Sequence, residues 1–117
     1  YVGDTAEAFV KCLNKKNTFG ETINIGSGFD ISIGDLVMLI AKLMKKKIKI
    51  VEDKIRIRPE KSEVFQLVSS IEKARDLLSW QSKHKNIDGL ALGLKKTINW
   101  FKKSKNLEKF KSLGYNI

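Results

Sequence analysis

Two arginine side chains lie two residues apart near the middle of this sequence, in the run Arg56-Ile57-Arg58-Pro59-Glu60-Lys61-Ser62-Glu63-Val64. Isoleucines and cations alternate there, which predicts a strand that places both guanidinium groups on one face. Such a pair can hold a diphosphate through paired hydrogen bonds, and the carboxylate of Glu63 can accept hydrogen bonds from ribose hydroxyls. An exposed, charged strand edge that discourages aggregation fits the same residues. The residue types alone leave both interpretations open.

Other residues that often carry chemistry form weaker patterns. Gly26-Ser27-Gly28 follows a predicted strand, yet Ile31 stands where a G-x-G-x-x-G loop needs its last glycine, and no P-loop motif occurs. We therefore interpret these glycines as a turn. His84 lies between Lys83 and Lys85 in a polar stretch and is predicted to be a surface side chain. No serine stands in a nucleophile-elbow context, so acyl-transfer catalysis has no support.

The cysteine and histidine content limits the possible cofactors. Cys12 is the single cysteine and His84 the single histidine, so neither an internal disulfide nor a zinc ligand set is expected. We expect a buried Cys12 thiol, no metal and a reducing, cytoplasmic location. The chain opens at Tyr1 without an initiator methionine or a leader pattern, which suggests a fragment. Its longest apolar stretch, residues 36–44, is far shorter than the roughly 20 residues of a membrane span.

The formal net charge of +10 comes from 23 basic and 13 acidic side chains. Charge of this size raises nucleic acid or another anionic partner as a possibility. All but three of the basic residues are lysines, whereas arginine is the side chain that planar phosphate and base recognition favours. We therefore expect a lysine-solvated surface. A small basic nucleic-acid-binding domain, motivated by the Lys-rich residues 95–111, is the alternative from another class.

The 117 residues suit one domain, in which helices predominate. Apolar residues recur at helical spacing in residues 4–14, 32–44, 70–78 and 86–101, and a short last helix is expected near 107–113. Asp4 and Ser32 each stand where a helix cap is expected, and Ser70 is the expected cap of the third helix. Phe9, Val10 and Leu13 form the apolar face of the first helix. Short strands are predicted at residues 21–25, 48–50 and 54–58.

The order of the motifs resembles the C-terminal part of the extended short-chain dehydrogenases/reductases that act on nucleotide sugars. Nearly the whole chain is covered by seven short motifs in the family's order. They are Tyr1-Val2-Gly3-Asp4-Thr5-Ala6, Ile23-Asn24-Ile25-Gly26-Ser27-Gly28, Ser32-Ile33-Gly34-Asp35-Leu36, Arg58-Pro59 with Ser62-Glu63-Val64, Lys73-Ala74, Leu77-Leu78-Ser79-Trp80, and Gly89-Leu90 with Thr97-Ile98-Asn99-Trp100. The Arg-Pro…Ser-Glu-Val form resembles most the sugar-nucleotide 4,6-dehydratases, including those of the GDP-mannose and N-acetylglucosamine type that feed legionaminic-like acid synthesis.

The resemblance implies an α/β fold, in which this chain is the C-terminal fragment of an extended Rossmann-type dehydratase. It implies a single, mostly helical substrate-binding lobe with short strands, in which residues 1–28 pack against a missing dinucleotide-binding domain. It also implies that Arg58, with Arg56 beside it, contacts the nucleotide diphosphate and that Glu63 contacts the ribose. Ser79 stands where the family usually has glycine, and Ser82 where it usually has proline.

The family's glycine-rich NAD(P) loop and its Tyr-x-x-x-Lys pair lie upstream and are absent from these residues. The implied function is therefore the substrate-binding part of an NAD- or NADP-dependent nucleotide-sugar 4,6-dehydratase, a lyase of carbohydrate biosynthesis, catalytically silent alone. A nucleotide-sugar 4-epimerase fragment is the alternative within the family. The implied partners are a GDP- or UDP-sugar, the missing domain and, in the full-length enzyme, further copies of the chain. Neither a membrane nor nucleic acid is an expected partner.

Overall fold

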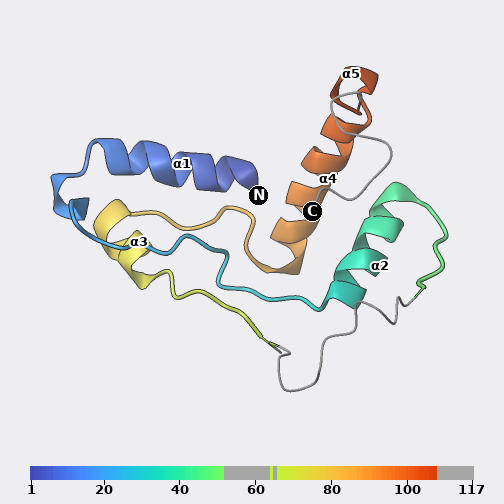
Figure 1. Ribbon diagram of the computed structural model, residues 1–117, viewed down its shortest axis with the longest axis horizontal. Coiled ribbons are helices and arrows are strands. Elements are labelled where there is room, and N and C mark those ends of the chain that lie inside the picture. The colour runs from blue at the N-terminus through green and yellow to red at the C-terminus, as the bar shows by residue number, and fades with distance from the viewer. Residues whose placement is uncertain (52–63, 65, 108–117) are drawn as a thin grey trace.

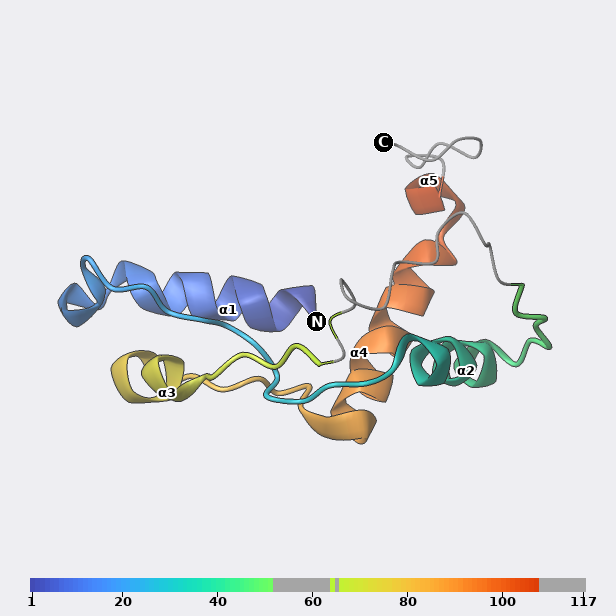
Figure 2. The same cartoon turned by 60° about the horizontal axis from the view of Figure 1, so that its bottom comes forward.

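The computed structural model describes residues 1–51, 64 and 66–107 and shows two helix pairs joined by long connections (Figure 1). The elements are α1 (Val2–Leu13), the 3-10 helix η1 (Lys16–Thr18), α2 (Ile33–Met44), α3 (Glu72–Leu78), α4 (Asn86–Phe101) and α5 (Ser104–Leu107). Helix α1 lies beside α3, and α2 packs against α4 (Figures 1 and 2). The radius of gyration is 17.5 Å, whereas a compact domain of this length has about 13 Å. The arrangement is therefore open.

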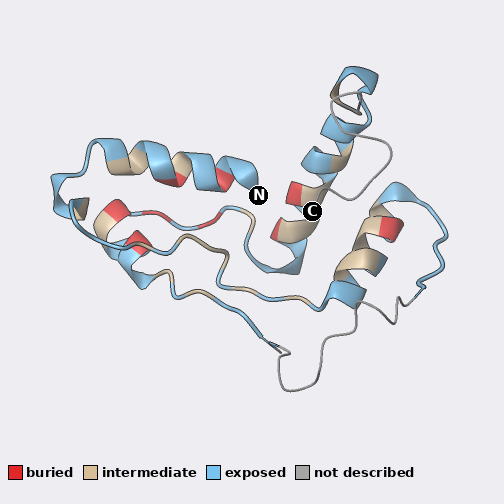
Figure 3. Ribbon diagram, in the orientation of Figure 1, coloured by how far each residue is buried: buried red, intermediate tan, exposed pale blue. Residues whose placement is uncertain are grey.

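A small core joins α1 to α3 and to the chain that follows α3 (Figure 3). Ala8 and Ala74 are buried, and their small side chains let the two helices approach closely. Leu78 and Trp80 fill the space beside them, and Trp80 is only 2% exposed. Ser79 separates the two and ends α3 in the left-handed region at φ 49°. This turn brings the Ser79 amide to the carbonyl of Arg75 at 2.9 Å and the Trp80 amide to the carbonyl of Ala74 at 3.1 Å, which ties the chain after α3 to the end of the helix.

Helix α2 confirms the sequence prediction at both ends. Ser32 is the N-cap, and its hydroxyl oxygen accepts a hydrogen bond from the Asp35 amide at 3.0 Å while its hydroxyl hydrogen goes to the Asp35 carboxylate at 2.7 Å. The helix ends at Lys45, which adopts a left-handed conformation at φ 54°. The Lys46 amide then reaches the carbonyl of Ala41 at 3.0 Å, which satisfies a carbonyl of the last turn.

The predicted strands and two predicted caps are not found. No strand occurs within residues 1–51, 64 and 66–107, so the predictions for residues 21–25 and 48–50 are wrong, and residues 54–58 lie outside the described part. A strand exists only through hydrogen bonds to a neighbouring strand, and these segments have no such neighbour among the described residues. Residues 21–25 instead pack Ile23 and Ile25 against the core. The N-caps of α1 and α3 are Tyr1 and Ile71, not Asp4 and Ser70, and neither is a side-chain cap.

Helix α1 buries a different face from the predicted one. Asp4, Ala8 and Cys12, which recur every four residues, face the core. The predicted apolar face is exposed: Phe9 by 71%, Val10 by 62% and Leu13 by 78%. The periodicity therefore identified an apolar face correctly, but that face has no cover within the described residues. None of the described helices is long and apolar enough to cross a lipid bilayer.

Candidate functional site

The predicted diphosphate and ribose ligands, Arg56, Arg58 and Glu63, lie outside the described residues, so their role stays a prediction. Val64, which follows Glu63 in the sequence, lines an open hollow of about 650 Å³. The other walls are residues 29–33, which follow the Gly26-Ser27-Gly28 turn, and residues 66–67. Two segments that the sequence analysis singled out separately therefore lie side by side at this hollow.

The described residues contain one buried polar centre, built around Asp4 at the start of α1. The Asp4 side chain is 8% exposed, and its carboxylate accepts three hydrogen bonds from the segment between α3 and α4. The Ser82 hydroxyl donates to Oδ2 at 2.5 Å, the His84 amide donates to Oδ2 at 3.0 Å, and His84 Nδ1 lies 2.8 Å from Oδ1. The Trp80 indole N–H donates to the backbone carbonyl of Asp4 at 3.2 Å. The start of α1 is thereby fixed to a segment almost eighty residues away.

The hydrogen bonds at this centre decide the charge of Asp4. Burial alone would raise the pKa of the carboxyl, because a charged group is poorly solvated inside a protein. The hydrogen bonds from Ser82 and His84, together with the attraction of the imidazole, outweigh burial and lower the pKa from 3.8 to about 2. Asp4 is therefore a carboxylate at neutral pH.

The carboxylate in turn determines the tautomer of His84. Because a carboxylate only accepts hydrogen bonds, Nδ1 must carry the proton that lies between His84 and Asp4. Nε2 is then the acceptor of the neutral ring, and the Lys96 ammonium lies 3.1 Å from it. The ring of Tyr1 packs against the imidazole at a centroid distance of 4.8 Å with the two planes tilted by 50°, and the Lys96 Nζ atom lies 4.9 Å from the centroid of the Tyr1 ring. The His84 side chain is 9% exposed, so its prediction as a surface residue is wrong.

Two glycines of α4 allow this close packing. A Cβ atom on Gly89 would lie 2.5 Å from the backbone carbonyl carbon of His84, a distance that no real contact allows. A Cβ atom on Gly93, one turn further, would lie 3.2 Å from the Cβ atom of Tyr1. Both glycines are buried. Gly89, which the sequence analysis noted only as part of a motif, is thus required where α4 crosses the His84 segment.

The residue types at this centre are those of a hydrolase triad, but the connections are different. In a triad the serine hydroxyl donates to the imidazole, which is oriented by the carboxylate. Here the Ser82 hydroxyl donates to Asp4 and accepts from the His84 amide at 3.1 Å. Ser82 is buried, so its hydroxyl is held in the loop and cannot act as a nucleophile. The atom that does face the imidazole Nε2 is the amine of Lys96.

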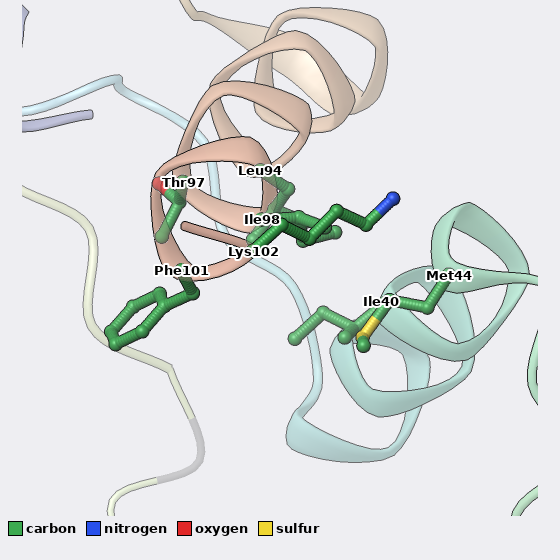
Figure 4. A pocket seen from close by; sticks show the side chains of 7 residues that line it. All are labelled: Ile40, Met44, Leu94, Thr97, Ile98, Phe101 and Lys102. Atoms are coloured by element: carbon green, nitrogen blue, oxygen red, sulfur yellow. The ribbon is translucent and has the colours of Figure 1, made fainter. Parts of the chain in front are cut away.

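An open groove lies between α2 and α4 (Figure 4). Its volume is about 420 Å³, and its walls are the side chains of Ile40, Met44, Leu94, Thr97, Ile98, Phe101 and Lys102. The hydroxyl of Thr97 donates a hydrogen bond to the carbonyl of Gly93 at 3.1 Å. Almost all of the surface is apolar, so the groove lacks the polar groups needed to orient a sugar or a phosphate.

Metal ligands do not gather anywhere in the described part. No group of three or more His, Cys, Asp or Glu side chains is close enough there to hold a metal ion. Nor do these residues form a dinucleotide site, because the turn at Gly26-Ser27-Gly28 lacks the third glycine and precedes no helix directly. A nicotinamide cofactor would need residues other than these.

Comparison with known proteins gives two informative relatives. No family model matches the chain, and no solved structure gives a significant match. The chain is 36% identical over 102 residues to a protein of Methanocaldococcus jannaschii provisionally named UDP-glucose 4-epimerase, a match that covers 87% of this chain and 30% of the relative. It is 32% identical over 114 residues to a UDP-glucuronate 4-epimerase of Thermodesulfobacterium geofontis, covering 97% of this chain and 32% of the relative.

The chain thus spans about a third of the length of the curated relatives that it matches. Both relatives are named as nucleotide-sugar 4-epimerases, which supports a place in the NAD-dependent epimerase/dehydratase family. Neither relative is named as a 4,6-dehydratase, the subtype that the sequence motifs indicated.

Proposed function

We propose that this chain is the nucleotide-sugar-binding portion of an NAD-dependent 4-epimerase. The observation that carries the proposal is the exposed apolar face of α1, formed by Phe9, Val10 and Leu13, on a chain that matches about a third of two nucleotide-sugar 4-epimerases. Exposed apolar patches of this kind mark surfaces that another protein unit covers. In this proposal residues 1–28 pack against the dinucleotide-binding portion, which supplies NAD binding and the catalytic groups.

The proposed substrate contacts are those that the sequence motif indicates. Arg58, with Arg56 beside it, holds the diphosphate, because a guanidinium group offers paired hydrogen bonds to phosphate oxygens. Glu63 accepts hydrogen bonds from the ribose. Support comes from Val64, which adjoins Glu63 and lines an open hollow large enough for part of a nucleotide.

The Asp4 centre has a positioning role in this proposal. Asp4 lies on the buried face of α1, opposite the exposed apolar face. Its hydrogen bonds to Ser82 and His84 fix α1 relative to the segment that leads into α4. The same helix would therefore face the dinucleotide-binding portion on one side and hold the substrate-binding lobe on the other.

A nucleotide-sugar 4,6-dehydratase is the second candidate, favoured by the order Arg58-Pro59…Ser62-Glu63-Val64. The two reactions differ in their products, since an epimerase inverts C4 and a dehydratase loses water and leaves a 4-keto-6-deoxy sugar. The two reactions can be distinguished by an assay of the chain together with its dinucleotide-binding portion. The substrates are UDP-glucose, UDP-glucuronate and GDP-mannose, and the products are identified by NMR. Inversion at C4 supports the epimerase, and loss of water supports the dehydratase.

Substrate binding is tested by titration of the same assembly with UDP-sugar. Arg58→Ala is expected to weaken binding by about tenfold to a hundredfold, as loss of a charge-assisted pair of hydrogen bonds would. Lys61→Ala, which removes a cation of the same segment, is the matched control and should change affinity far less. Equal effects of the two substitutions would show that only net charge matters. Nucleic-acid binding that weakens steeply as the salt concentration rises, without any sugar-nucleotide binding, would favour the alternative of a basic nucleic-acid-binding domain.

A further inference from the structure

Asp4, His84 and Lys96 form a line of three side chains in which each one contacts the next. Asp4 Oδ1 lies 2.8 Å from His84 Nδ1, and His84 Nε2 lies 3.1 Å from the Nζ atom of Lys96. A nucleophile within hydrogen-bond distance of a base, with the base oriented by a third group, is the general arrangement that activates side-chain nucleophiles. The amine of Lys96 occupies the position of the nucleophile.

The direction of proton transfer along this line follows from the hydrogen bonds. Asp4 is an anion that accepts from Nδ1, so the lone pair of the neutral imidazole is on Nε2 and faces Lys96. A proton that moves from the ammonium to Nε2 produces an imidazolium next to a buried carboxylate, which stabilises it. Lys96 can therefore lose its proton to a base that is already in place.

Lys96 is also held in position and open to small molecules. It is exposed on α4 and lies over the ring of Tyr1 at 4.9 Å, which restricts the amine to the neighbourhood of the imidazole. It lines a surface hollow of about 270 Å³ together with Tyr1, Val2, Thr97 and Trp100. Lys95 lies next to it in the sequence, is exposed as well, and adds positive charge that attracts an anionic reagent.

We propose that Lys96 is a preferred site of covalent acylation, with a small acyl phosphate as the donor. The ammonium proton passes to His84 Nε2, and the free amine attacks the acyl carbon. A C–N bond forms, the C–O bond to phosphate breaks, and phosphate leaves with the electron pair. Of the two protons that the ammonium loses, the one taken up by His84 Nε2 is released to the solvent, and the other leaves with the phosphate. The acyl-lysine has no charge to place over Tyr1, so the contact between α4 and the start of α1 weakens.

The test is treatment of the whole chain with acetyl phosphate, followed by peptide mass spectrometry at each lysine over time. Lys96 is expected to react about tenfold faster than Lys95, the matched control on the same helix, because base assistance contributes at least this much. In His84→Gln the two lysines should react at equal rates. Equal rates in the unmodified sequence, or an excess at Lys96 that persists in His84→Gln, would overturn the proposal.

Discussion

The carboxylate of Asp4 lies 2.8 Å from Nδ1 of His84, although the two residues are 80 positions apart in the sequence. This contact joins the first turn of α1 to the segment that leads into α4, and it explains why an aspartate stands on the buried face of a helix. It also fixes the orientation of the His84 ring, whose other nitrogen, Nε2, faces Lys96. The structural and the chemical properties of this region therefore depend on the same pair.

Replacement of Asp4 by asparagine is expected to destabilise the chain by about 2–3 kcal/mol, because an amide presents a donor where Ser82 or His84 also donates. The free energy of unfolding, measured by urea denaturation, checks this value. Asp76→Asn is the control, since Asp76 is exposed and its pair with Arg75 spans 3.4 Å. That substitution should change stability by no more than about 0.5 kcal/mol. A loss of unfolding free energy for Asp4→Asn as small as that of the control would contradict the structural role of Asp4.

The lowered pKa of Asp4 makes stability dependent on acid. The pKa of Asp4 is about 2 in the folded chain and 3.8 without the folded surroundings, so the unfolded state binds a proton more readily. The stability that Asp4 contributes is therefore fully present above about pH 4 and is lost as the pH falls through about 2. By about pH 2 the loss should reach about 2 kcal/mol. Urea midpoints measured from pH 6 downwards should show this component in the unmodified chain and not in Asp4→Asn.

Gly89→Ala is expected to destabilise the chain by more than about 2 kcal/mol, because the new methyl group would overlap the backbone of His84. Backbone atoms cannot rotate away as a side chain can, so α4 or the His84 segment must move. Gly34→Ala on α2 is the control, since the nearest atom to its added methyl is Ser32 Oγ at 3.8 Å. Alanine favours a helix over glycine by about 1 kcal/mol, so this variant should be at least as stable as the original. Thermal unfolding followed by circular dichroism compares the two.

Ser79→Gly is expected to raise stability by about 0.5–1 kcal/mol. Ser79 adopts φ 49° at the end of α3, a conformation that glycine reaches without the steric strain of a Cβ atom. Ser79→Ala keeps that strain and should bring no gain. The midpoint of thermal unfolding measures both, and a gain from alanine equal to that from glycine would rule out backbone strain as the reason.

Sequence reasoning predicted the helices better than the contacts between them. The periods of α2 and α4, and the Ser32 cap, depend on residues within a few positions of each other, so they can be predicted locally. A strand depends on a neighbour from another part of the chain, and residues 21–25 have a suitable pattern without such a neighbour in the described part.

The Asp4 centre was missed for a related reason. The neighbours of His84 in the sequence, Lys83 and Lys85, suggested a solvated side chain, whereas its partners in space come from α1 and α4. The signal available in the sequence was indirect: Ser82 and His84 are spaced to meet one carboxylate, and Gly89 removes the side chain that would block them. The predicted ligands Arg56, Arg58 and Glu63 lie outside the described residues and stay predictions.

The exposed face of α1 provides the last prediction. Phe9→Glu, at a side chain 71% exposed, should leave the free energy of unfolding of this chain nearly unchanged, because no buried contact is lost. It should abolish association with the dinucleotide-binding portion, since a charge buried in an apolar interface lacks a partner. Ile50→Glu, exposed by 59% after α2, is the control for added charge and should retain association. Co-purification of the two portions checks both variants. Loss of association in both, or in neither, would mean that α1 is not the interface.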